Sequence, residues 1–138
     1  MKPEIIQYED HPKGWGHERW IVNKEKYCLK ILSFKKDSSF SMHYHIEKEE
    51  TWYVSKGSLE LSYYDLTNAK RISKTIDKGM VVDIKPNIPH KLKALEDSEI
   101  IEVSTQHFEH DSYRVEPGDS QNEKTVNWVV IINNFIWT

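Results

Sequence analysis

The chain has 138 residues, enough for one domain with a buried core, and carries a formal net charge of -3. Its pI near 6.2 excludes the strongly basic character typical of nucleic-acid-binding proteins. One cysteine, Cys28, excludes an internal disulfide, and neither an apolar leader nor a run of about 20 apolar residues is present. We therefore expect a single cytoplasmic domain over residues 1–138, without nucleic acid or membrane as a partner.

Short runs of β-type residues, separated by turn residues, follow one another along the chain and predict a sandwich or barrel. The expected strands cover residues 19–23, 27–34, 40–45, 50–54, 58–65, 71–76, 80–84, 90–95 and 99–106. Turn signals such as Lys56-Gly57 and Lys78-Gly79 lie between them. No long stretch has a helical period. We predict an all-β domain with its barrel core at about residues 15–106 and a tail over 107–138.

The end of the chain divides into a polar part and an apolar part. Residues 109–124 are polar, contain Pro117-Gly118, and are predicted to form a loop or an extended tail. The run Val126–Trp137 is strongly apolar, and an open strand of this kind invites aggregation unless it is covered. We expect it to pair with a sheet edge of the same chain or of a second copy, and therefore predict a homodimer.

Four donor residues from separate parts of the chain predict a metal site. Residues two apart on a strand point to the same side, so His43 and His45 can both face the interior. A short turn returns Glu50 to this pair, and His90 begins a later strand. Three imidazoles and one carboxylate suit a divalent ion, with Zn expected first and Fe, Mn, Ni or Co as alternatives. Such a set leaves positions open for water or substrate.

A His-x-His pair alone is more often a surface feature than a metal site, but here the wider spacing resembles the cupin motifs. The first motif, G-x5-H-x-H-x3-4-E-x6-G, is matched at His43, His45, Glu50 and Gly57. The second, G-x5-P-x-G-x2-H-x3-N, is matched loosely at Gly79, Pro86 and His90. The departures are Asp37 for the first glycine, Ile88-Pro89 for the glycine turn and Ala94 for the final asparagine. The resemblance covers about residues 15–106, and implies a double-stranded β-helix (jelly-roll barrel) with the four donors as metal ligands.

Glu49 also fits the variable gap of the first motif, but Glu50 keeps the six-residue gap to Gly57. Three segments resemble type II mannose-6-phosphate isomerases and their standalone relatives: Lys13–Trp20, Tyr27–His45 and Ile101–Arg114. This resemblance implies a metal-dependent sugar-phosphate isomerase of carbohydrate metabolism, with a phosphorylated or nucleotide-linked sugar as its small-molecule substrate. The group's later Tyr-Gly-Arg stretch, which carries a catalytic arginine, has no counterpart here.

Such an isomerase needs a base to move a proton and cations to hold the phosphate. Lys30 and Arg114 are the candidate cations, and Glu102 is the candidate acid or base if its side chain faces inward. Trp52 is expected on the inner face, against a sugar ring. Two other functions stay open: an Fe(II)-dependent dioxygenase of a small molecule using the same four ligands, and a non-catalytic sugar-binding module. A metal-free nucleotide-sugar epimerase would leave the four donors unused.

Overall fold

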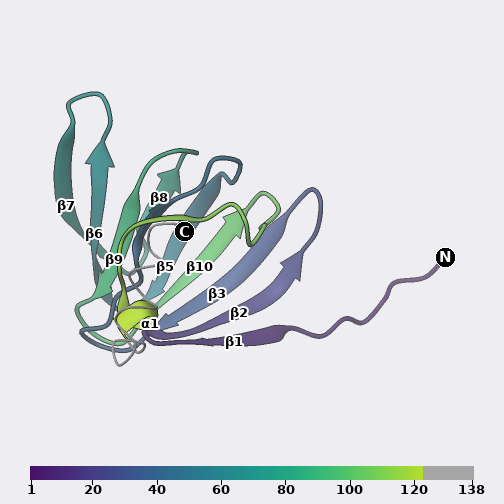
Figure 1. The fold of residues 1–138 in the computed structure, drawn as a ribbon. Helices are drawn as coiled ribbons and strands as arrows, with labels where there is room; N and C mark the ends of the chain where they lie inside the picture. The colour runs from purple at the N-terminus through teal and green to yellow at the C-terminus, as the bar shows by residue number, and fades with distance from the viewer. Residues whose placement is uncertain (123–138) are drawn as a thin grey trace.

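Two antiparallel sheets face each other across a shared core in the computed structural model, which describes residues 1–122 (Figure 1). The strands are β1 (Glu9–Lys13), β2 (Gly16–Asn23), β3 (Cys28–Phe34), β4 (Met42–Tyr44), β5 (Glu50–Lys56), β6 (Ser58–Asp65), β7 (Lys70–Asp77), β8 (Val81–Ile84), β9 (His90–Ala94), β10 (Ser98–Ser104) and β11 (Tyr113–Glu116), followed by the short helix α1 (Asp119–Asn122). One sheet has the order β1-β2-β3-β10-β5-β8, and the other β11-β4-β9-β6-β7. The all-β prediction is confirmed.

Alternation along the strands places one face of each sheet in the core. Every second residue of β3 and β10 is buried, as expected for strands with one face toward a second layer. Apolar members of this inner set hold the sheets together through the hydrophobic effect. The core cluster consists of Trp15, Leu32, Phe34, Phe40, Trp52, Val54, Leu59, Leu61, Ile76, Ile84, Leu92, Ala94 and Ile100.

The nine predicted strands correspond to β2 through β10, with boundaries that differ by a few residues. The prediction of loop or tail over residues 109–124 is wrong in part, because β11 and α1 lie there. In addition, β1 was not predicted, because its EDHPK segment is charged and contains Pro12. A proline is tolerated there because, among the strands of residues 1–122, β1 lies at a sheet edge and pairs only with β2. The apolar run Val126–Trp137 and its predicted pairing lie outside the described residues.

The turns explain why the motif departures leave the fold intact. Asp37 stands in place of a motif glycine with a φ of 69°, and Asn87, in the second motif's turn, has a φ of 70°. Asp and Asn enter this left-handed region more easily than other non-glycine residues. Gly57 has a φ of 84°, and an added Cβ would lie 2.5 Å from the carbonyl oxygen of Asp97. The glycine retained from the first motif is thus required by both conformation and space.

The segment after β10 crosses from the six-stranded sheet to the five-stranded sheet, where β11 pairs with β4 (Figure 1). Asn23 fixes its start, because the side-chain amide exchanges two hydrogen bonds with the main chain of His107. Asp111 fixes its end, because the carboxylate accepts hydrogen bonds from the main-chain N–H groups of Ile46 and Lys48 at 2.8 and 3.0 Å. This crossing segment therefore closes over one end of the sandwich, where the candidate site lies.

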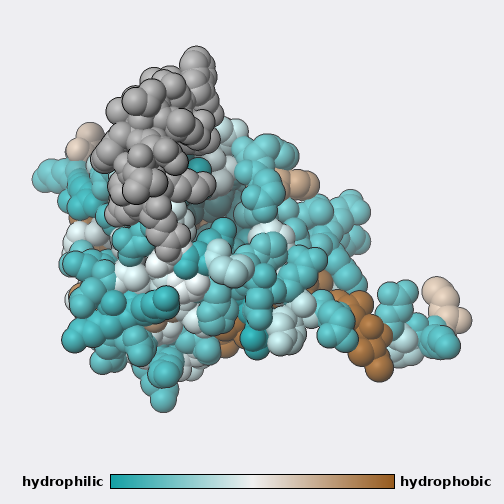
Figure 2. All heavy atoms as spheres, turned by 60° about the horizontal axis from the view of Figure 1, so that its bottom comes forward, coloured by the Kyte–Doolittle hydropathy of each residue, from teal (hydrophilic) through white to brown (hydrophobic). Residues whose placement is uncertain are grey.

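The N-terminal residues extend away from the sheets as an arm (Figure 1). Figure 2 shows a largely hydrophilic surface, with apolar atoms on this arm, where Ile5 and Ile6 are exposed. Within residues 1–122, no helix has the length and apolar character needed to cross a membrane.

Candidate metal centre

The three predicted histidine ligands come together at one end of the sandwich. His43 of β4 and His90 of β9 are register partners, and their ring centroids are 4.7 Å apart. His45 follows directly after β4, and one nitrogen from each of the three rings lies within 4.8 Å of the others. The pairing of β4 with β9 thus joins a motif at residue 43 to a donor 47 positions later in the sequence.

Glu50 begins β5 and points its carboxylate at these rings. Its Oε2 lies 3.6 Å from Nε2 of His45, and its Oε1 lies 3.7 Å from Nε2 of His90. Glu49 instead points outward and pairs with Lys85, so it does not join the cluster. The structure therefore brings together all four residues predicted as ligands, and their metal ligation stays a prediction.

The protonation of the three rings is set by main-chain carbonyl groups. Nδ1 of His43 lies 2.7 Å from the carbonyl oxygen of Ser41. Nδ1 of His45 lies 2.5 Å from the carbonyl oxygen of Asp111, and Nδ1 of His90 lies 2.8 Å from that of Ile88. A carbonyl oxygen can only accept, so each Nδ1 must carry the proton and donate it. In a neutral imidazole the other nitrogen, Nε2, then presents a lone pair. This is the tautomer that a metal ligand needs, oriented by its outer hydrogen bond.

Two buried atoms of the cluster fit a metal ion better than a closed hydrogen-bond network. Within the described chain, Nε2 of His90 and Oε2 of Glu50 have no hydrogen-bond partner. Contacts of 3.6 and 3.7 Å are too long for hydrogen bonds. Leaving a buried polar atom without a hydrogen bond costs about 1–3 kcal/mol, and the ammonium of Lys48, 3.4 Å from Oε2 of Glu50, compensates the charge of that atom in part. An ion held by three imidazoles and a carboxylate would supply their missing partner.

Electrostatics favour the protonation states that bind metal. Burial lowers the pKa of His43 and of His90 because it disfavours a charged ring. Burial alone would raise the pKa of Glu50, but the ammonium of Lys48 and the neighbouring imidazoles together outweigh it and lower this pKa below its usual range. Burial thus favours the neutral form of His43 and His90, and Glu50 stays ionised.

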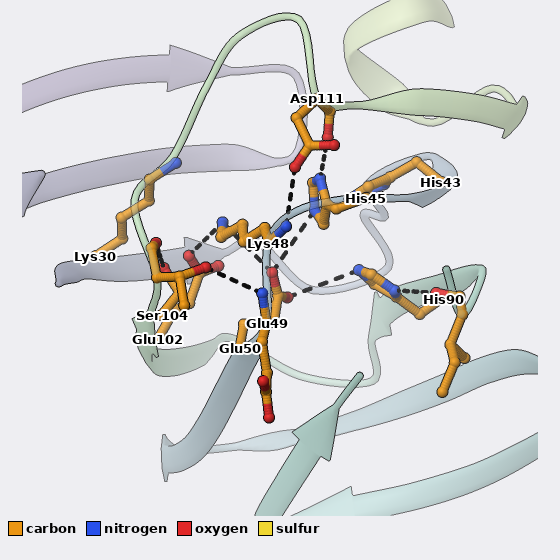
Figure 3. A network of polar contacts seen from close by, with 12 residues as sticks. Lys30, His43, His45, Lys48, Glu49, Glu50, His90, Glu102, Ser104 and Asp111 are labelled. Atoms are coloured by element: carbon orange, nitrogen blue, oxygen red, sulfur yellow. Dashed lines mark hydrogen bonds and ion pairs between the residues drawn. The ribbon is translucent and has the colours of Figure 1, made fainter. Parts of the chain in front are cut away.

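The sequence did not predict a role for Lys48, which is a central charge of the site. Its Nζ lies 2.7 Å from Oε2 of Glu102 and 3.4 Å from Oε2 of Glu50, and all three side chains are buried (Figure 3). The two carboxylates raise the pKa of Lys48 despite its burial. Burial raises the pKa of Glu102, although Lys48 acts in the opposite direction. Glu102 thus faces inward, as its candidate role requires.

A cavity of about 460 Å³ opens beside the donor cluster and is lined by three of its members, His43, His45 and Glu50. The inner face of the six-stranded sheet, β4 and the crossing segment form its walls. Lys30 lines it, but its ammonium is 3.3 Å from Oε1 of Glu18 and 4.2 Å from the centre of the Trp20 ring. Because this cation is already paired, it has less capacity to hold a phosphate than the sequence suggested.

Arg114 also lines the cavity and is the less encumbered cation. It is the register partner of His43 across β11 and β4, so both side chains leave the sheet on the same face. Within residues 1–122 its guanidinium has no carboxylate within 4.0 Å. Arg114 is an exposed position of β11, so its guanidinium can be reached from solvent at the cavity wall.

The expectation for Trp52 is confirmed for its inward position and wrong for its place in the pocket. Its side chain faces inward, but it is only 1% exposed and does not line the cavity. Its Nε1–H donates to Oε1 of Glu50 at 2.7 Å. The indole therefore packs in the core and orients a predicted metal ligand, instead of lying against a ligand in the pocket.

Solved structures with the same arrangement of strands include two cupins. A variant of oxalate decarboxylase from Bacillus subtilis superimposes with a TM-score of 0.71 at 18% identity, covering 95% of this chain and 35% of that chain. CapF, a capsular polysaccharide assembling protein from Staphylococcus aureus, gives 0.71 at 18% identity, covering 81% and 32%. The chain has the cupin fold.

The cupin assignment rests on structure, since no family model and no curated protein matches the sequence. The chain spans about a third of the length of the cupin structures that it matches. Another structure in this set concerns the Mn(II) centres of oxalate decarboxylase. The cupin fold is thus shown, while the resemblance to mannose-6-phosphate isomerase is not confirmed.

Proposed function

We propose that this cupin binds one divalent metal ion through His43, His45, Glu50 and His90, and acts on an anionic sugar derivative in the adjoining cavity. One observation carries the metal part of the proposal. Three Nδ1–H groups donate to carbonyl oxygens, which leaves three Nε2 lone pairs beside an ionised carboxylate. Zn is the first candidate, and Mn gains support from the Mn(II) centres of oxalate decarboxylase.

The ligand class is a phosphorylated or nucleotide-linked sugar, with isomerisation as the proposed reaction. Support comes from the cations of the cavity: Lys30 and Lys48 are paired with Glu18 and Glu102, whereas Arg114 lines the cavity with no carboxylate of residues 1–122 within 4.0 Å. A phosphate is well matched by a guanidinium. CapF, a capsular polysaccharide assembling protein, offers a fold-level analogy for a sugar-linked ligand.

Each of these cavity residues would have a separate role in the proposed isomerisation. When bound, the metal would polarise carbonyl and hydroxyl oxygens of an open-chain sugar. Glu102 would move a proton between adjacent carbons, its carboxylate held in place by Lys48. Arg114 would hold the phosphate, and Lys30 would fix the position of Glu18 along the wall. This arrangement needs one base, one anion site and one metal within a single cavity.

The test is a panel of sugar phosphates incubated in D₂O with the Zn- or Mn-loaded protein and followed by NMR. The proposal predicts deuterium incorporation next to the carbonyl carbon, lost in Glu102→Gln. Arg114→Gln should weaken substrate affinity about 10-fold or more, since a charge-assisted hydrogen bond contributes roughly 1.5–3 kcal/mol. Lys93→Gln, on an exposed position of β9, is the matched control and should leave affinity unchanged.

The dioxygenase and the sugar-binding module give different outcomes in the same panel. Oxygen consumption with Fe(II), and no deuterium incorporation, would favour the dioxygenase over the isomerase. Binding of a sugar phosphate without any exchange would favour the binding module. Equal affinity of wild type and Arg114→Gln for every anionic sugar would remove the phosphate part of the proposal.

A further inference from the structure

Asp111 lies at the point where the crossing segment meets the candidate metal site. It is 2% exposed and precedes β11 by two residues. Its carboxylate faces the short loop between His45 and Glu50, and its carbonyl oxygen faces the ring of His45 (Figure 3). One buried residue thus contacts the ring of His45 and the loop that leads from His45 to Glu50.

The carboxylate of Asp111 holds three consecutive main-chain N–H groups. Oδ1 accepts from Ile46 at 2.8 Å and from Glu47 at 3.1 Å, and Oδ2 accepts from Glu47 at 3.2 Å and from Lys48 at 3.0 Å. Charge-assisted bonds of this kind are stronger than neutral ones. Residues 46–48 span the turn that returns the chain from His45 to Glu50, so the carboxylate fixes the distance and angle between these two donors.

The main-chain oxygen of Asp111 has a separate effect on His45. It accepts the Nδ1 proton at 2.5 Å and so directs Nε2 toward the other donors. The corresponding carbonyl groups for His43 and His90 come from Ser41 and Ile88, each two residues earlier in the chain. His45 alone among the three depends on a distant segment for its orientation, because its partner lies 66 positions later in the sequence.

We propose that Asp111 is a positioning residue for the metal centre, so that docking of the crossing segment, residues 105–112, and metal binding are one coupled equilibrium. This inference rests on the proposed metal site. It goes beyond that proposal because the crossing segment, most of which was predicted to belong to the tail, would then be a part of the metal centre. Coupling is reciprocal: a segment that orients two donors must itself be held more tightly when the metal is bound. The ion would thereby stabilise the wall that carries His107, Glu109 and His110 over the cavity.

The experiment compares metal affinity in wild type, Asp111→Asn and Glu116→Gln after removal of metal with a chelator. Asparagine keeps one acceptor but turns an NH₂ group toward the N–H donors of residues 46–48. Loss of a contact that orients a metal ligand typically lowers metal affinity about 10–100-fold. Glu116→Gln is the matched control: it removes the ion pair with Arg71 that holds β11, yet touches neither His45 nor residues 46–48. We expect Zn and Mn affinity to fall at least 10-fold in Asp111→Asn and to change less than 2-fold in Glu116→Gln.

Two further readouts separate positioning from loss of folding. The visible spectrum of the Co²⁺-loaded protein should change in Asp111→Asn and not in the control, because coordination geometry sets these bands. In wild type, Zn should slow hydrogen exchange at the amides of residues 46–48 and of the crossing segment, a measurement that needs no variant. Unchanged exchange at these amides on Zn binding, or wild-type affinity in folded Asp111→Asn, would overturn the inference alone. Absence of metal binding by folded wild type would overturn the proposed function and this inference together.

Discussion

Replacing Lys48 by methionine removes the ammonium group between two buried carboxylates. Nζ lies 2.7 Å from Glu102 and 3.4 Å from Glu50, and none of the three side chains is more than 6% exposed. At an effective dielectric constant of about 20, these contacts are worth about 6 and 5 kcal/mol before desolvation. Removal of one partner of a buried pair costs about 3–5 kcal/mol in practice. We expect metal-free Lys48→Met to lose about this much free energy of unfolding at pH 7.

The assay is urea denaturation followed by tryptophan fluorescence, in the presence of a chelator. The pKa of Lys48 is raised in the folded state. The contribution of charged Lys48 to the free energy of unfolding is therefore complete below the usual lysine pKa of about 10.4, and it is lost only as the pH rises above that value. Adding Glu102→Gln to Lys48→Met should recover part of the loss, since one uncompensated charge disappears. Saturating Zn should also reduce the loss, because the ion would compensate Glu50.

Lys85→Met is the matched control for this prediction. Lys85 also has two carboxylate partners, Glu49 at 3.0 Å and Asp83 at 3.3 Å, but its side chain is 62% exposed. Exposed ion pairs contribute little, so its midpoint in urea should stay at the wild-type value. A loss below about 1 kcal/mol in Lys48→Met, or no recovery in the double variant, would refute the electrostatic reasoning.

Three other expectations follow from the fold. Gly57→Ala should cost at least about 2 kcal/mol in thermal or urea unfolding, since its φ is 84° and the new Cβ would meet the main chain of Asp97; a smaller loss would contradict this. Burial, followed by the charges of Lys30 and Lys48, lowers the pKa of His107 to about 3. The stabilisation of the folded state by neutral His107 is therefore complete above about pH 6.5, and it falls as the pH drops toward 3. Between pH 6 and 4, His107→Gln should reduce the slope of unfolding free energy against pH by up to about 1 kcal/mol per pH unit. An unchanged slope would count against the lowered pKa of His107. The predicted homodimer is checked by light scattering, where a monomer mass would exclude it.

The sequence predicted much of the fold because each sheet keeps one face in the core. Alternation along β3, β5 and β10 is visible as a period of two, and the turn glycines mark the ends of strands. β1 and β11 were missed because short, charged edge strands lack this pattern. Their pairing is decided by partners far along the chain, such as the contacts of Glu116 with Tyr64 and Arg71.

The predicted donors come together because strand parity and motif spacing are local properties of the sequence. Glu50 was preferred to Glu49 on spacing, and the two side chains indeed point to opposite faces. Lys48 and Asp111 could not be found in this way. Both act through contacts between a loop and a later segment, and an isolated Lys or Asp in a loop looks like any solvated charge.

The measurement that tests the central claim most directly is a calorimetric titration of the chelator-treated protein with Zn²⁺ and with Mn²⁺, using wild type and His43→Ala. His43 is the least buried of the three rings, so its replacement is the least disruptive to the fold. We expect one ion bound per chain in wild type and at least a 100-fold loss of affinity in the variant, because a ligand contributes more than an outer contact. Folded wild-type protein that takes up neither ion, or a variant that binds as wild type does, would contradict it.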